Sequence, residues 1–415
     1  MLLLLQIIVI TLSFISLEHE TLAALPYTSV VLPIHKHTDA SKPLYSVQVM
    51  TAYVNMQFLK QNLLIDTDAP IIWRTCSLQW NMYQGSCPPD TQCAFPVSCE
   101  EYQCTEARTS SHTRIPTANE KPTSQRYLTQ LNYDDFTFNQ SNGGNVYTGL
   151  YGAYPNAACA PSSSLQSFPA NVTGVMALSS SPYALPARLV DPLKRVIGLC
   201  LPSTLSALGV LLYGDSPYYL LPQSSVDVRS YLSYTPLINV NHSDSFGYYI
   251  GVNNIVIKKR SIAIPADAIT KISTTEPYTI LRSDIYNPVV RRFSMVTKRI
   301  PQATPVPPFG LCFSSSTSGT QVSLKVPDID FSLPEGKKWT MSAANSIKQV
   351  TPDVACLALV DGGASFEPAI VIGSFQMEDN FLVFNLENST FGFSSSLLRK
   401  KTSCSNFNYT LVSSY

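Results

Sequence analysis

The chain has 415 residues, and its 28 Lys and Arg residues are balanced by 28 Asp and Glu residues, so its formal net charge is zero. This balance gives no indication of nucleic-acid or anionic-membrane binding, and the length exceeds what one hydrophobic core usually serves, so two lobes are expected. Thirty prolines and a low charged fraction of 13% favour short strands separated by turns, and hence an all-β (mainly β) fold.

Residues 1–24 are predicted to be a signal peptide. Met1–Ile10 is almost entirely apolar, and the segment ends in the small residues Ala23 and Ala24, which suit signal-peptidase cleavage. A membrane anchor needs about 20 unbroken apolar residues, whereas Glu18 and Glu20 interrupt this segment. We therefore expect a secreted, extracellular chain without a membrane partner.

Ten cysteines form an even set, which in an exported chain favours five disulfides over a metal site. They are Cys76, Cys87, Cys93, Cys99, Cys104, Cys159, Cys200, Cys312, Cys356 and Cys404. The five histidines do not have zinc-ligand spacing with them, so neither a metal nor a cofactor is expected. The segment His35-Lys36-His37 is expected on an exposed strand or loop.

Five Asn-x-Ser/Thr sequences are acceptors for N-linked glycans. Their asparagines are Asn139, Asn171, Asn241, Asn388 and Asn408. Acceptors of this kind function only in a secreted chain, so they agree with the predicted signal peptide.

Two turn sequences correspond to each other in the two halves of the chain. Leu63–Trp73 has the form of a strand that runs into a tight turn presenting Asp66, and Thr270–Ile280 has Ser273 at the corresponding place. Each turn is followed much later by an apolar segment that contains glycine. These segments are Thr173–Leu178 and Ile370–Ser374. The repeat indicates two lobes, in each of which one segment is threaded beside an earlier one.

Further elements are predicted in the second half. Tyr248–Ile257 and Phe381–Leu386 have the apolar patterns of strands. Ser283–Lys298 is the clearest helix, with Ser283 as its N-cap and basic residues in its last turns.

In the order of these segments, the chain resembles the pepsin-like aspartic proteases. It is most similar to their plant relatives, the family of basic 7S globulins, extracellular dermal glycoprotein, and xylanase and xyloglucan-endoglucanase inhibitors. The resemblance covers nearly the whole mature chain. It rests on Leu64–Cys76, Cys159–Ser163, Gly174–Ala187, Gly198–Ser203, Gly214–Pro222, Tyr248–Val252, Pro277–Tyr286 and Thr402–Asn408.

The resemblance implies a bilobal pepsin-like fold with a few short helices. It implies an N-terminal lobe over residues 25–228 and a C-terminal lobe over residues 229–415, with Asp66 and Ser273 meeting between them. It also implies that Cys312 bonds to Cys356 and that Cys404 ties the C-terminus back.

Ser273 stands where the pepsin-like enzymes have their second aspartate. Peptide hydrolysis in that architecture needs two carboxyl groups about 3 Å apart that share one proton, and a serine hydroxyl cannot complete this acid–base exchange. The glycine that follows each Thr is also replaced, by Asp68 and Thr275, so the second turn is expected to relax. We expect no catalytic residue, and Asp66 as a structural acid hydrogen-bonded by its own turn and by Ser273.

The resemblance implies that the function is protein binding. Family inhibitors block microbial cell-wall glycoside hydrolases, and a basic side chain can meet the paired catalytic carboxylates of such a target. The family's xylanase inhibitors use a His just before the last Cys, which residues 397–404 lack. Its glucanase inhibitors use one Arg in this tail and one in a loop before a Val-Pro-x-Ile-Asp segment. The candidates here are Arg399, Lys400, Lys401 and Gln321.

Two function classes stay open from the sequence. The first is an inhibitor of a pathogen's secreted glycoside hydrolase, of the xyloglucan-specific endoglucanase or xylanase type, acting in plant defence in the apoplast and cell wall. The second is a non-inhibitory binding or storage protein of the basic 7S globulin type, with a peptide or a wall glycan as its ligand. A residual aspartic peptidase is the remaining alternative.

Overall fold

The computed structural model describes residues 27–38, 43–52, 58–75, 78–79, 93–96, 131–133, 135–160, 165, 168–189, 193–223, 225–240, 245–315 and 324–413. The predicted signal peptide (1–24), Cys76, Cys87, Cys99, Cys104, Asn241 and Gln321 lie outside the described residues, as do the side chains of Cys93 and Cys159.

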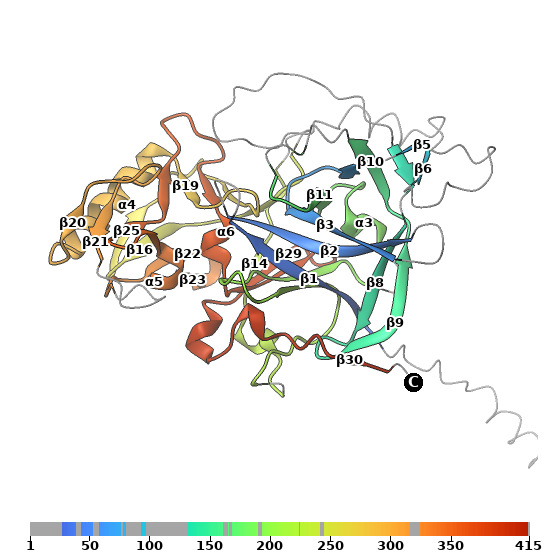
Figure 1. Ribbon diagram of the computed structural model, residues 1–415. Coiled ribbons are helices and arrows are strands. Elements are labelled where there is room, and N and C mark those ends of the chain that lie inside the picture. The colour runs from blue at the N-terminus through green and yellow to red at the C-terminus, as the bar shows by residue number, and fades with distance from the viewer. Residues whose placement is uncertain are drawn as a thin grey trace, which may run out of the picture.

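The molecule is mainly β and has two lobes, as the sequence predicts (Figure 1). The strands of the first half are β1 (Ser29–His37), β2 (Leu44–Ala52), β3 (Phe58–Asp66), β4 (Ile72–Thr75), β5 (Leu78–Gln79), β6 (Cys93–Pro96), β7 (Leu131–Tyr133), β8 (Phe136–Ser141), β9 (Val146–Ala153), β10 (Asn156–Ala160), β11 (Val172–Ala177), β12 (Val196–Cys200), β13 (Gly209–Gly214) and β14 (Ser233–Pro236). Those of the second half are β15 (Tyr248–Ile250), β16 (Asn254–Ile257), β17 (Arg260–Ala263), β18 (Thr270–Ile272), β19 (Thr279–Leu281), β20 (Gln302–Ala303), β21 (Cys312–Ser314), β22 (Ile329–Ser332), β23 (Lys338–Met341), β24 (Ile347–Thr351), β25 (Val354–Leu357), β26 (Leu359–Asp361), β27 (Ile370–Ile372), β28 (Phe381–Asn385), β29 (Thr390–Phe393) and β30 (Leu411–Val412).

The described helices are few, and most are short. They are α3 (Leu185–Arg188), α4 (Ser283–Val296), α5 (Ala343–Ser346) and α6 (Ser374–Met377), with the 3-10 segments η3 (Val228–Tyr231), η4 (Pro334–Gly336), η5 (Leu397–Lys400) and η6 (Cys404–Asn406). No helix among the described residues has the length and apolar character needed to cross a membrane.

One large sheet contains strands from both halves of the chain. Strands β1–β14 share it with β28, β29 and β30, whereas the other strands of the second half form one five-stranded and two four-stranded sheets. β28 is antiparallel to β12, with Phe384 opposite Ile197. β29 is antiparallel to β14, which already lies beyond residue 229. The sheet therefore continues across residues 228 and 229, where the sequence predicts the lobe boundary.

The internal repeat is realised as the same strand arrangement in both halves. In the first half, β11 is parallel to β3, with Ala177 opposite Asp66, and antiparallel to β4. In the second half, β27 is parallel to β18, with Ile372 opposite Ile272, and antiparallel to β19. The later strand thus lies between the two strands that flank each turn, which confirms the predicted threading.

Helix α4 differs in its ends from the prediction. Ser283 is the first helical residue and Arg282 is the N-cap, with an extended backbone and no side-chain cap; the helix ends at Val296. Ser283 Oγ donates instead to Asp361 Oδ1 (2.6 Å). Burial of Ile285, Tyr286, Val289 and Phe293 holds the helix on the core.

The predicted strand over 248–257 is wrong as a single element. It consists of β15 and β16, which belong to different sheets and are separated by Gly251–Asn253. The predicted strand at the end of the chain is confirmed as β28, one residue shorter.

The segment His35-Lys36-His37 lies on a strand, but Lys36 is not exposed as predicted. Its side chain is 6% exposed, and Nζ donates to Glu378 Oε1 (2.8 Å) and to Ser203 O (2.7 Å). A charged side chain can be buried because a carboxylate of opposite charge is buried with it.

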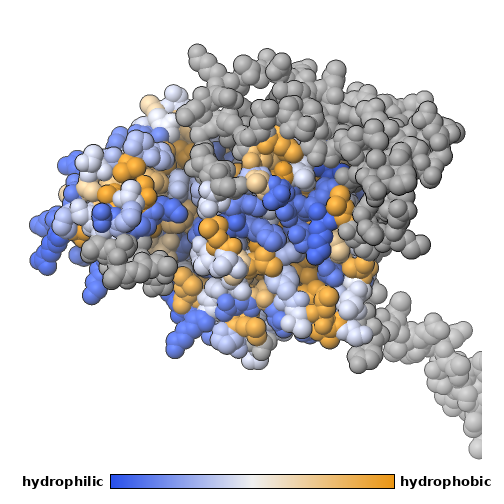
Figure 2. All heavy atoms as spheres, in the orientation of Figure 1, coloured by the Kyte–Doolittle hydropathy of each residue, from blue (hydrophilic) through white to orange (hydrophobic). Residues whose placement is uncertain are grey.

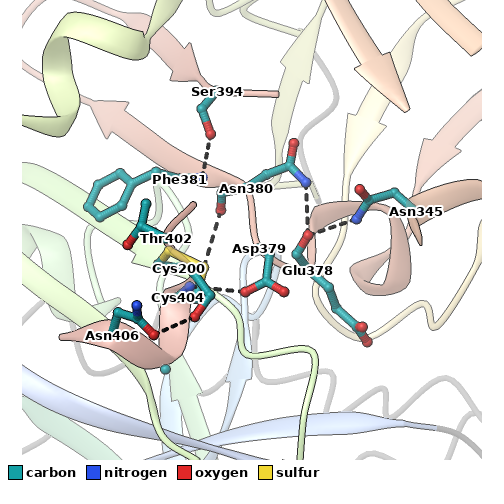
Figure 3. Close-up of a disulfide and its surroundings, with 12 residues drawn as sticks. Cys200, Asn345, Glu378, Asp379, Asn380, Phe381, Ser394, Thr402, Cys404 and Asn406 are labelled. Carbon is teal, nitrogen blue, oxygen red and sulfur yellow. Dashed lines mark hydrogen bonds between the residues drawn. A yellow bond between two sulfur atoms is a disulfide. The ribbon is translucent and has the colours of Figure 1, made fainter. Parts of the chain in front are cut away.

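The Cys312–Cys356 bond implied by the family resemblance is present, and Cys404 ties the C-terminus back, as the resemblance also implies. Cys312 and Cys356 are opposite each other on β21 and β25 and form one bond. Cys404 bonds to Cys200, at the end of β12 (Figure 3). The C-terminal tail is therefore fixed covalently to the first half of the chain.

Candidate functional site

The Asp66 and Ser273 turns are joined by hydrogen bonds between two threonines and the opposite backbone. Thr274 Oγ1 donates to Ile65 O (2.8 Å) and accepts from the amide of Thr67 (3.2 Å). Thr67 Oγ1 donates to Ile272 O (3.2 Å). Both threonine side chains are buried. The two turns are therefore held together, as the resemblance implies.

Asp66 lies at the end of β3 and is bonded within its own turn. Its Oδ1 accepts from the amide of Asp68 (2.8 Å). Burial raises its pKa to about 6; the Asp68 carboxylate raises it further, and the amides of Asp68 and Ala69 and the Lys271 ammonium oppose the shift. A proton can therefore be held on Asp66 in mildly acidic solution.

Ser273 directs its hydroxyl to its own turn. Oγ accepts from the amide of Glu276 (3.1 Å) and lies 3.2 Å from Thr275 Oγ1. The predicted hydrogen bond between Ser273 and Asp66 is wrong, because neither of these two described side chains has the other as a hydrogen-bond partner.

Asp68 is engaged by the second half of the chain. Its carboxylate forms an ion pair with Lys271 on β18, and Oδ1 accepts from Ser245 Oγ (3.3 Å), which is also bonded to Tyr249. Neither Asp68 nor Thr275 is among the described residues with positive φ, so both turns have relaxed. The sequence alone did not identify Lys271 as a site residue. The only signals for it were its charge next to the apolar Ile272 and the acidic Asp68 at the glycine position of the first turn.

The arrangement can bind water or a hydrogen-bonding group through Asp66, but it offers no second carboxyl group for a shared proton. Asp68, two residues further along the chain, is held in an ion pair with Lys271. Among the described residues, no three metal-ligating side chains are gathered in one place.

The basic tail lies beside the Val326–Asp330 segment that the resemblance pairs with it. Two of the predicted partner-binding cations already have intramolecular partners. Arg399 Nη2 donates to both carboxylate oxygens of Asp328 (2.7 and 2.8 Å), and Lys400 Nζ lies 4.9 Å from the centre of the Tyr231 ring. Gln321, the fourth candidate, is outside the described residues.

Lys401 is the tail cation without a partner among the described residues. It is exposed and caps η5 in the left-handed conformation, with φ of 58°. Its amide bonds to the carbonyls of Leu397 and Leu398. Because this conformation favours Gly or Asn, a lysine here carries a conformational cost.

Four of the predicted glycan acceptors are described. Asn171 and Asn388 are exposed, whereas Asn139 and Asn408 are partly buried. Asn139 Nδ2 donates to Tyr147 O (3.3 Å). A glycan on Asn171 or Asn388 would meet the least steric obstruction.

The chain is similar to known proteins along most of its length. Residues 49–215 match the family model "Xylanase inhibitor N-terminal" and residues 247–395 match "Xylanase inhibitor C-terminal". The chain is 33% identical to Gamma conglutin 1 of Prunus dulcis, over 98% of this chain and 95% of that protein.

Two solved structures are similar along almost their whole length. The structure titled "edgp" has a TM-score of 0.75 at 27% identity and covers 92% of this chain and 98% of its own. Conglutin gamma, described as a basic 7S globulin from lupine seeds, has a TM-score of 0.74 at 27% identity and covers 92% and 99%. The chain therefore belongs to the xylanase-inhibitor family of pepsin-like proteins, which includes the gamma conglutins and basic 7S globulins.

Proposed function

We propose that this chain is a secreted, catalytically inactive pepsin-like protein that inhibits a microbial cell-wall glycoside hydrolase in the plant apoplast and cell wall. The family models for xylanase inhibitors support binding of this class of partner. The loss of peptidase activity is supported by Ser273, whose hydroxyl is used within its own turn. Secretion is supported by the sequence of residues 1–24 and by the glycan acceptors.

The observation that carries the inhibitory function is the exposed Lys401 on a tail fixed at both ends. The ion pair of Arg399 with Asp328 lies on one side of Lys401, and the disulfide of Cys404 lies on the other. A rigid loop that presents a free ammonium group can enter an open substrate cleft and meet the paired carboxylates of a glycoside hydrolase. A lysine lacks the two-pronged donor geometry of Arg, so the fit of the loop to the target's substrate cleft must supply part of the specificity for that target.

The test is a titration of the purified protein into a panel of fungal xyloglucan-specific endoglucanases and xylanases. We expect dose-dependent inhibition of a member of the panel. Lys401→Ala should weaken that inhibition by about tenfold or more, the range for a desolvated charge contact.

Lys400→Ala is the matched control, because it removes the neighbouring ammonium, which lies over Tyr231. Lys401→Gly removes the ammonium group, as Lys401→Ala does, but it also relieves the left-handed backbone strain. Comparison of the two variants therefore separates the effect of the charge from that of the backbone. Equal losses from Lys400→Ala and Lys401→Ala would contradict a specific role for Lys401.

A second candidate is a non-inhibitory binding or storage protein, as the similarity to conglutin gamma from lupine seeds allows. The observation that favours it is the internal pairing of Arg399 with Asp328, which withdraws that cation from a partner. Absence of inhibition across the whole panel would favour this candidate. Casein cleavage at acid pH that a transition-state-like peptide inhibitor blocks would instead revive the peptidase alternative.

A further inference from the structure

Although the net charge of the chain is zero, its basic residues are unevenly distributed over the molecule. Three short basic segments lie on the β16–β17 hairpin, on α4 and directly after α4. They are Lys258–Arg260, Arg291–Arg292 and Lys298–Arg299. We name them the basic surface. None of its side chains has an ion-pair partner in the part of the chain that the structure describes. In Figure 2, strongly hydrophilic side chains protrude at the end of the molecule where Figure 1 draws α4, β16 and β20.

A hydrogen-bonded contact joins the helix to the hairpin. Arg292 Nε donates to Ile257 O (3.3 Å) and Nη2 donates to Lys258 O (3.2 Å). The partly buried Arg292 therefore fixes α4 against the turn between β16 and β17. Lys298 and Arg299 lie in the turn that follows the end of α4 at Val296. The first two basic segments are thus held together, and the third follows from the end of the same helix.

The turn that carries the two lysines is unfavourable for them. Ile257 is opposite Arg260, so Lys258 and Lys259 are the two central residues of the hairpin, and both have positive φ, 47° and 65°. Two-residue turns of this kind favour Asn and Gly, and side chains with a Cβ and no local hydrogen bond carry a conformational cost there. Such strain is typical of residues kept for function.

Helix electrostatics account for only part of the basic surface. Lys298 and Arg299 follow the C-terminus of α4, where cations are favoured. The hairpin lysines receive no such benefit. The strand register brings Asp328 and Asp330 to the same end of the sheet, because Ile257 is opposite Ile329. Asp328 is paired with Arg399 and Asp330 accepts from Thr340 Oγ1, and within the described residues neither forms an ion pair with a lysine of the turn.

We propose that the basic surface binds a linear polyuronate, a polysaccharide with one carboxylate on each sugar. Three basic segments spread over one surface fit a ligand with repeated, evenly spaced anions. The described exposed apolar residues include Met295 on this face but no aromatic side chain there, so the surface offers neither a stacking platform for nucleic-acid bases nor an apolar centre for a folded protein partner.

The experiment measures binding of the full-length protein to polygalacturonate by isothermal titration at low and at physiological ionic strength. We expect binding that weakens as salt increases. The double variant Lys258→Glu/Lys259→Glu should bind at least about tenfold more weakly, since it replaces two cations that attract the polyanion by two anions that repel it.

The matched control is Lys337→Glu/Lys338→Glu, which makes the same charge change at the opposite end of the same sheet, where Lys338 is opposite Ser332. It should bind like the unchanged protein. A second variant, Lys258→Asn/Lys259→Gly, has residues that the turn favours, so a loss of binding in it cannot be ascribed to misfolding.

Three results would overturn the proposal. One is equal weakening by the control pair. Another is equal binding of fully methyl-esterified polygalacturonate, which has the same sugars without the charge. The third is equally tight binding of single-stranded DNA or of an acidic protein, which would show a surface that does not distinguish among polyanions.

Discussion

Asp66 is a carboxylic acid at a site where its charged form is poorly solvated. In an active pepsin-like site, a second carboxyl group would share its proton. Here the second turn supplies Ser273, which is bonded to its own turn, and the nearest cation, Lys271, is paired with Asp68. Asp66 is consequently a destabilising charge at neutral pH, in contrast to the purely supporting role expected from the sequence.

Replacement of Asp66 by asparagine is expected to stabilise the protein above pH 6. Because the folded pKa of about 6 is above the ordinary pKa of 3.8 for an aspartate, the folded state binds the proton more tightly, and stability is lost as pH rises from about 4 to about 6. The introduced amide would remain neutral, and its oxygen could still accept from the Asp68 amide. At pH 7 to 8 the gain should approach about 3 kcal/mol, measured by urea unfolding.

The gain should vanish near pH 3, where both the folded and the unfolded protein carry a protonated Asp66. Asp353→Asn, at an exposed carboxylate, serves as the control and should not change the pH profile. A stability difference that is independent of pH would contradict this electrostatic explanation.

The elements that sequence patterns predicted best are those whose signal is local. The Asp66 turn and the later glycine-containing strand carry apolar residues that need burial on both faces, so the threading of β3, β11 and β4 could be predicted. The apolar pattern of residues 248–257 predicts one strand in place of β15 and β16, because it continues past Gly251 to Val252, although the chain changes sheet there.

The missed features depend on residues distant in sequence. The Asp68–Lys271 pair joins positions 203 residues apart, and no local pattern marks Lys271 as its partner. Similarly, the sequence indicates the basic tail as a candidate partner-binding segment, but only the folded chain shows that Arg399 is paired with Asp328.

Removal of the disulfide at the tail is expected to affect both the stability of the protein and the inhibition proposed above. Cys200 and Cys404 are 204 residues apart, so the bond closes a long loop in the unfolded chain. The double variant Cys200→Ser/Cys404→Ser should lose about 2–5 kcal/mol of unfolding free energy. Calorimetry and the endoglucanase titration should show lower stability together with weaker inhibition.

The matched variant Cys312→Ser/Cys356→Ser removes a bond within the second half of the chain. It should be destabilised but, when assayed below its unfolding temperature, should still inhibit. Loss of inhibition to the same extent in both variants would argue against a specific role of the tail.

At the scale of the whole molecule, a buried ion pair connects the two ends of the chain. Lys36 on β1 donates to Glu378, which follows α6 and also accepts from Tyr45 OH (2.5 Å). Burial raises the pKa of Glu378 and the Lys36 ammonium opposes that shift. Removal of one partner therefore leaves the other charge buried and uncompensated.

Glu378→Gln is expected to lower the unfolding free energy by about 3 kcal/mol or more. The double variant Lys36→Met/Glu378→Gln should recover most of that loss, because it removes both charges together. Urea unfolding of the two single variants and the double variant gives the coupling energy. If the two losses add without coupling, the pair does not act as a unit.

The shared sheet also constrains how the protein is made. Strand β12, from the first half, is hydrogen-bonded to β28, whose residues lie close to the end of the chain. During synthesis the ribosome must therefore complete almost the entire polypeptide before β12 acquires this neighbour. Until then its exposed edge is open to pairing with other nascent chains, so the first lobe depends on folding assistance for longer than its own length would suggest.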